Sequence, residues 1–177
     1  MRRWTLEFDF VIAKSGPKAL IMIPPHLSHT RELRLHGILQ SHSDSIREIY
    51  SCEAPALEHF EFTGTNYFPV TFPDLGGDML FKGNAPKLRA FSLSRDVIPW
   101  SLVPRGLTQL KIAGPDEDDR IPSELDQLID LLVNCPALEI LALESCLPDQ
   151  LAEYPHIRTI HLPTFPACAF AVQPPAS

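Results

Sequence analysis

Apolar residues recur along this chain in a spaced pattern, leucine-x-x-leucine-x-leucine, in which isoleucine or phenylalanine can replace leucine. The complete copies are Leu57-Phe60-Phe62, Leu88-Phe91-Leu93, Leu107-Leu110-Ile112, Leu138-Leu141-Leu143 and Ile157-Ile160-Leu162. The pairs Leu33-Leu35 and Phe8-Phe10 match the last two positions of the pattern. Because apolar and polar residues alternate in each copy, as in a β-strand with one buried face, the pattern predicts six or seven short strands.

The copies form a repeat of irregular length. Their middle apolar residues lie 19 to 31 residues apart, and three copies begin alike, with Ala54-Pro55-Ala56-Leu57, Ala85-Pro86-Lys87-Leu88 and Cys135-Pro136-Ala137-Leu138. A proline at this point gives each strand a rigid, extended start that needs no ladder donor. A single unit of this size cannot bury its apolar face alone, so we expect the units to stack into a curved solenoid over residues 1–163.

Segments between the strands favour helices. Residues 126–134 are rich in leucine and isoleucine and stop at Cys135-Pro136, and Ser123 is placed to cap the start of this helix. Weaker helical patterns cover residues 44–52 and 77–83. Strands that alternate with helices pair in parallel, because a parallel connection needs a crossover. The sequence therefore predicts an α/β domain with a parallel sheet.

Four phrases of the chain carry a family resemblance. They read RELRLHG at 31–37, EAPALEHF at 53–60, LFKGNAPKLR at 80–89 and LVNCPALE at 132–139. In this order they resemble the leucine-rich-repeat region of F-box-like proteins from mushroom-forming fungi, over about residues 3–163. Together with the strand pattern, the resemblance implies an irregular leucine-rich-repeat-like solenoid. Short parallel strands would form its concave face, and helices or loops its convex face.

The resemblance also implies a function. In that family an N-terminal F-box segment docks on the Skp1 adaptor of a cullin ubiquitin ligase, and the repeats hold substrates. It therefore implies a protein-interaction module that acts as a ligase substrate receptor. The chain opens directly on a strand, so we expect a fragment or a relative that lacks the F-box, and a Skp1-type adaptor as partner only where an F-box lies upstream. The alternatives are a hydrolytic or small-molecule-binding α/β domain with one deep pocket, and a gene fragment without function.

The polar residue between the last two template positions should lie mid-strand on the concave face. The column of such residues is Arg34, Glu61, Ser92, Lys111, Ala142 and His161. With neighbours two positions away on the same face, the candidate binding residues are Arg34, His36, His59, Glu61, Ser92, Gln109, Lys111, Glu144 and His161. Both signs of charge occur among them, which indicates a protein or peptide partner rather than one recognised by a single sign of charge.

Composition narrows the partners and the compartment. The 177 residues are 45% hydrophobic, and 15 basic against 22 acidic side chains give a formal net charge of -7. Such a chain is a poor phosphate binder, so we expect no nucleic-acid partner. We also expect no membrane partner, because no apolar run approaches a membrane span and no secretion signal is evident. The four cysteines show no metal-binding or redox spacing, which favours reduced thiols in the cytoplasm or nucleus.

Catalytic and metal-binding motifs do not emerge from the sequence. The histidines at 26, 29, 36 and 42 do not predict four convergent zinc ligands, because His26 follows Pro24-Pro25 in a loop and His36 ends a strand. The acidic run at 116–119 lacks the glycine and glutamate of an EF-hand, and Gly76-Gly77 lacks the Lys-Ser/Thr of a P-loop. We therefore expect no enzyme activity and no cofactor, packing roles for both tryptophans, and a disordered tail over 164–177.

Overall fold

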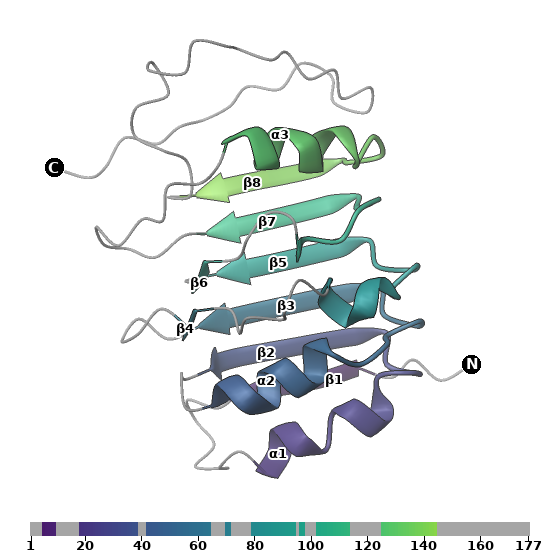
Figure 1. The fold of residues 1–177 in the computed structure, drawn as a ribbon, viewed down its shortest axis with the longest axis vertical. Coiled ribbons are helices and arrows are strands. Elements are labelled where there is room, and N and C mark those ends of the chain that lie inside the picture. Colours follow the sequence, from purple (N-terminus) through teal and green to yellow (C-terminus); the bar gives the residue numbers. More distant parts are fainter. Residues whose placement is uncertain are drawn as a thin grey trace, which may run out of the picture.

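The computed structural model describes residues 5–9, 18–38, 42–64, 70–71, 79–94, 96–97, 102–113 and 125–144. Within these residues the chain has an α/β fold built on a six-stranded parallel sheet, in the order β1-β2-β3-β5-β7-β8 (Figure 1). Its strands are β1 (Thr5–Asp9), β2 (Glu32–Ile38), β3 (His59–Gly64), β5 (Ala90–Ser94), β7 (Gln109–Ala113) and β8 (Ile140–Glu144). Two short strands, β4 (Val70–Thr71) and β6 (Asp96–Val97), pair separately and were not expected from the pattern.

The register of the main sheet follows the repeat. Neighbouring strands align the middle apolar residues of successive copies, and this row is Leu33, Phe60, Phe91, Leu110 and Leu141. The last apolar residues form a second row two positions on, which is Leu35, Phe62, Leu93, Ile112 and Leu143. The predicted strands and their parallel pairing are therefore confirmed from β2 to β8. The expected strand around Ile160 lies outside the described residues.

The first strand corrects the expected register. The pattern paired Phe8 and Phe10 with the last two template positions, but the sheet aligns Leu6 with Leu33 and Phe8 with Leu35. The error is a slip of two residues. Because side chains alternate with a period of two, such a slip leaves every residue on the same face, and alternation alone cannot detect it. The correct register is fixed by backbone pairing with β2.

The described helices all lie on one face of the sheet (Figure 1). They are α1 (Lys18–Ile21), α2 (Ser43–Tyr50), α3 (Leu125–Val133) and the short 3-10 segments η1 (Pro24–His26) and η3 (Leu80–Gly83). The helices expected at 44–52 and 126–134 are confirmed as α2 and α3. Ser123, the expected cap of α3, lies outside the described residues, as do Trp4, Trp100, Gly76-Gly77, the acidic run at 116–119 and the tail.

The core lies between the sheet and these helices. The two apolar rows on β2, β3, β5 and β7 are at most 4% exposed, and α2 adds Ile46, Ile49 and Tyr50 to them. These three residues recur at helical spacing, so one face of α2 is apolar while its other face meets solvent. Aromatic rings fill the centre of the core. The ring centroid of Phe81 in η3 lies 5.4 Å from that of Phe60 and 6.1 Å from that of Tyr50, and both pairs are edge to face. Each such side chain contributes about 1.5–3 kcal/mol on burial.

The recurring lead-in forms the same turn in each copy. The amide of the first template leucine donates to the carbonyl three residues earlier, from Leu57 to Ala54, from Leu88 to Ala85 and from Leu138 to Cys135, at 3.0–3.1 Å. Proline therefore occupies the second position of each turn, where its fixed φ is favoured. The start of each strand is then bonded to the residue that precedes the neighbouring strand. The amides of Glu58 and His59 both donate to the carbonyl of Arg31, and the same pattern recurs at the next three strands. This paired donation occurs in the same way at the start of β3, β5, β7 and β8 and so keeps these strands in one register.

The segment expected to be helical at 77–83 has a different structure where it is described. In η3 the backbone turns left-handed at Phe81 (φ 56°, ψ 33°), Lys82 (φ 53°, ψ 25°) and Gly83 (φ 69°). Only glycine adopts this conformation without steric cost. The turn carries Phe81 into the aromatic cluster and leaves Lys82 exposed. Burial of Phe81 offsets the strain that an apolar periodicity could not reveal.

Candidate interaction surface

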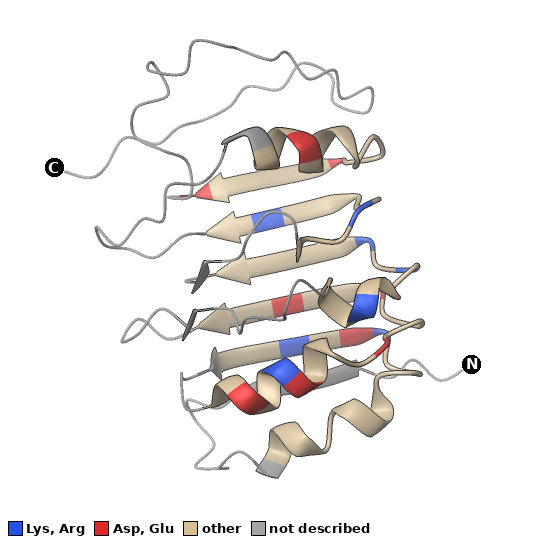
Figure 2. Cartoon of the chain, viewed as in Figure 1, with Lys and Arg blue, Asp and Glu red and all other residues tan. Residues whose placement is uncertain are grey.

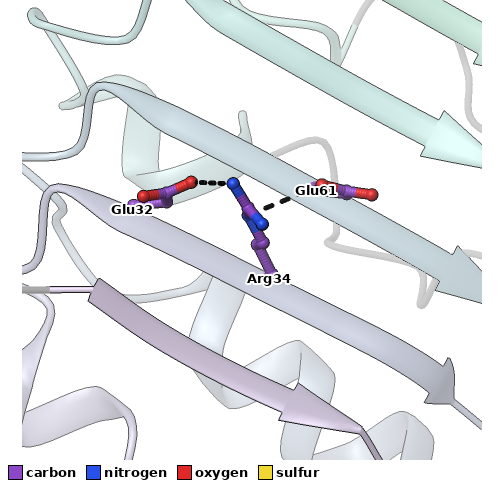
Figure 3. A network of polar contacts seen from close by, with 3 residues as sticks. All are labelled: Glu32, Arg34 and Glu61. Carbon is purple, nitrogen blue, oxygen red and sulfur yellow. Dashed lines mark hydrogen bonds and ion pairs between the residues drawn. The ribbon is translucent and has the colours of Figure 1, made fainter.

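The polar residues of the strands lie on the side of the sheet away from the helices. We call this side, over β2, β3, β5, β7 and β8, the open face. Figure 3 shows Glu32, Arg34 and Glu61 on the near side of the sheet with the helices behind it. Arg34 and Glu61 have side chains 40% exposed, and Lys111 is exposed. Arg34 and Lys111, both in the column predicted from the template, are therefore accessible to solvent.

The register arranges the open face in three parallel rows. The central row is Arg34, Glu61, Ser92, Lys111 and Ala142, in the order expected from the template. The row at the start of the strands is Glu32, His59, Ala90, Gln109 and Ile140, and the row at their ends is His36, Thr63, Ser94, Ala113 and Glu144. Eight of the nine candidate binding residues thus share one face. The ninth, His161, lies outside the described residues.

Arg34 is held between two carboxylates. One terminal nitrogen of its guanidinium bonds Oε1 of Glu32 on the same strand, and its Nε lies 3.7 Å from Oε2 of Glu61 on β3 (Figure 3). Exposed ion pairs of this kind contribute about 0–1 kcal/mol each to stability. Their larger effect is electrostatic, because the three side chains together keep one negative charge in excess. Glu32 was not among the candidate residues, although its position two residues before Arg34 puts both on the same face.

Lys111 stands in a different environment. Its neighbours in the central row are Ser92 and Ala142, and its neighbours along β7 on the same face are Gln109 and Ala113. None of these four carries a charge. Lys111 is exposed, and among the described residues it makes no ion pair.

The charges of the open face are therefore divided by strand. On β2 and β3 the described open-face residues hold two carboxylates and one guanidinium, on β5 there is no charge, and on β7 Lys111 is the one charged residue. Glu144 adds a carboxylate at the end of β8. Figure 2 shows charged residues of both signs gathering over β2, β3 and the helix α2. A partner would meet an excess of negative charge at one side and a single positive charge two strands away.

The edge strand β8 is less buried than the pattern predicted. As middle residues of their template copies, Leu110 and Leu141 should both lie on the buried face of the sheet, but Leu141 is only partly buried, whereas Leu110 is 0% exposed. Within the described residues β8 has a paired neighbour on one side only, which explains the difference. Ile140, on the open face of the same strand, is 41% exposed. An apolar side chain is thus accessible beside the polar rows.

Histidines elsewhere contribute no metal centre to the described structure. His26 and His29 stack edge to face at 5.3 Å, and His42 is buried just before α2, where loss of solvation lowers its pKa. Across the described ranges, no three histidine, cysteine, aspartate or glutamate side chains gather as metal ligands, and Cys52 and Cys135 are free thiols. Nor does any described helix have the length and apolar character to cross a membrane.

Comparisons with known proteins leave the family open. No family model matches the sequence, and no curated protein or solved structure matches the chain significantly.

Proposed function

We propose that this chain is a protein-interaction module that holds a partner protein on its open face. The observation that carries the proposal is the central row, in which polar residues from the four neighbouring strands β2, β3, β5 and β7 stand side by side without a helix over them in the described structure. A sheet buried on both faces would place apolar residues in this row. The polar row instead provides donors, acceptors and both signs of charge, which is typical of protein recognition.

We further propose that the architecture is an irregular leucine-rich-repeat-like solenoid. Three features support it: strands that pair in chain order, one lead-in turn repeated at three strands, and helices or short turns on one side only. Repeats of this kind build extended binding surfaces from many strands. The open face would then be the concave face of the solenoid.

The resemblance of the four phrases to F-box-like proteins extends the proposal to a biological role. The chain would be the substrate-receptor region of a ubiquitin ligase component, and a Skp1-type adaptor would bind only where an F-box lies upstream. A hydrolytic or ligand-binding domain needs polar groups that converge on one point. The groups of the open face are instead spread over five strands, which favours the interaction module.

Affinity capture with matched variants tests the proposal. Ser92→Arg places a long charged side chain at the centre of the open face, and Ser45→Arg makes the same change on α2, on the helix side. We expect wild type and Ser45→Arg to retain the same partner proteins and Ser92→Arg to lose them, with thermal midpoints showing that both variants fold. Equal capture by all three proteins would contradict the proposal. A chain extended upstream by an F-box, assayed beside the bare chain, tests adaptor binding separately.

A further inference from the structure

The described rows of the open face have room for a short peptide. Five strands at about 4.8 Å spacing span about 19 Å, and the distance along a strand between the first and third rows is about 13 Å. An extended segment of a partner protein can therefore cross all five strands within about six residues.

The charges fix how such a segment would lie. The excess negative charge is at Glu61 and its neighbours on β2, and an exposed positive charge is at Lys111 on β7. The register places both in the central row, two strand spacings or about 9.6 Å apart. A segment that crosses the strands could therefore place a basic side chain over Glu61 and an acidic one over Lys111.

The strand between these charges allows close approach. The open-face residues of β5 are Ala90, Ser92 and Ser94, which are all small and uncharged. A peptide backbone can come nearer to the sheet here than over Arg34 or Lys111. The backbone groups of the sheet are engaged in its own ladder, so the face offers side chains but no backbone donors to a crossing peptide.

A polyproline II segment matches both the separation of the two charges and the lack of backbone donors on the face. It has three residues per turn and a rise of about 3.1 Å per residue, so side chains at i and i+3 lie on one side about 9.3 Å apart. Its backbone makes no internal hydrogen bonds and stays hydrated, so it needs none from the sheet. In a β-strand, residues i and i+3 point to opposite sides, and i and i+2 are only about 6.7 Å apart.

We propose that the open face binds a polyproline II segment of a partner protein in which a basic residue and an acidic residue are three positions apart, the basic residue over Glu61 and the acidic one over Lys111. The proposal rests on the proposed function, because it names the partner chemistry of the same surface. It applies in either chain direction of the peptide, since the charges alone set the alignment.

A charge-swap titration tests this proposal. The probes are fluorescein-labelled proline-rich peptides that contain one lysine and one glutamate at spacings of two, three and four positions, in both orders. We expect the three-position peptides to bind most tightly by fluorescence anisotropy. Lys111→Glu should weaken the binding of these peptides roughly threefold to tenfold. The Lys111→Glu variant should in turn bind a peptide in which lysine replaces glutamate more tightly than it binds the original peptide. Lys87→Glu makes the same charge change at an exposed site away from the open face, and it should change binding less than twofold.

The remaining outcomes separate the two levels of inference. Two results would overturn the peptide proposal and leave the proposed function standing. One is peptide binding that Ser92→Arg abolishes but that does not depend on the spacing of the two charges. The other is a charge-swapped peptide that binds Lys111→Glu no better than the original peptide does. No binding to any peptide, together with partner capture unaffected by Ser92→Arg, would overturn both. Self-association of the chain in light scattering that Lys111→Glu removes would show that a second copy occupies the face, and would also overturn the peptide proposal.

Discussion

Replacing Lys82 by glycine should stabilise the protein. Lys82 has φ 53° and ψ 25°, a left-handed conformation that costs a residue with a Cβ about 1–2 kcal/mol. Glycine removes this cost but loses about 0.5–1 kcal/mol more conformational entropy on folding. Because the side chain of Lys82 is exposed, its loss removes little packing. We therefore expect the free energy of unfolding to rise by about 0.5–1 kcal/mol.

The assay is urea unfolding followed by circular dichroism, with two controls. Lys82→Ala keeps the Cβ and should leave the midpoint almost unchanged. Lys87→Gly changes an exposed lysine whose φ is negative, and it should destabilise the fold slightly. A lower midpoint for Lys82→Gly, with an unchanged slope, would refute the left-handed turn at η3 and with it the placement of Phe81 in the aromatic cluster.

Three other outcomes follow from burial and charge. Leu110→Ala should cost about 3–5 kcal/mol, and Leu141→Ala about 1–2, because Leu110 is fully buried and Leu141 only partly; equal losses in urea unfolding would contradict the edge position of β8. Lys111→Glu should leave the free energy of unfolding within about 0.5 kcal/mol. Arg34→Glu should lower it by about 1–2 kcal/mol in the same assay, because it places three carboxylates side by side on β2 and β3. Because the pKa of His42 is lowered in the folded state, the unfolded chain takes up a proton first as the pH falls, and stability should be lost below about pH 6.5. His42→Asn should flatten this pH dependence in unfolding midpoints measured from pH 7.5 to 5.

Most of the sheet could be predicted from the sequence, because its signal is repeated. The same lead-in turn precedes Leu57, Leu88 and Leu138, and alternation after it fixes which side chains share a face. Alternation around Leu33-Leu35 and Phe60-Phe62 also predicts that Arg34 and Glu61 lie in one row. The slip at β1 arises because Leu6, Phe8 and Phe10 offer two registers that differ by two residues, and both registers keep the same side chains on each face.

Other features depend on contacts that one-dimensional patterns do not contain. The left-handed turn at Lys82 is stabilised by burial of Phe81 against residues from α2 and β3, which are distant in sequence. The partial exposure of Leu141 depends on which strand lies beside it. The excess negative charge at Glu61 arises because Glu32 and Glu61 both pair with Arg34. The division of charge over the open face therefore depends on the register that places these three side chains together.

Site-specific photo-crosslinking tests the central claim most directly, because it records which face touches the partner. A photoreactive amino acid is introduced at Ser92 on the open face and, as the matched control, at Ser45 on α2. We expect partner proteins to crosslink from position 92 and not from position 45. Excess unlabelled wild-type chain should compete the crosslink away, and excess Ser92→Arg should not. Partners captured from position 45 alone, or equally from both positions, would contradict the assignment of the open face as the interaction surface.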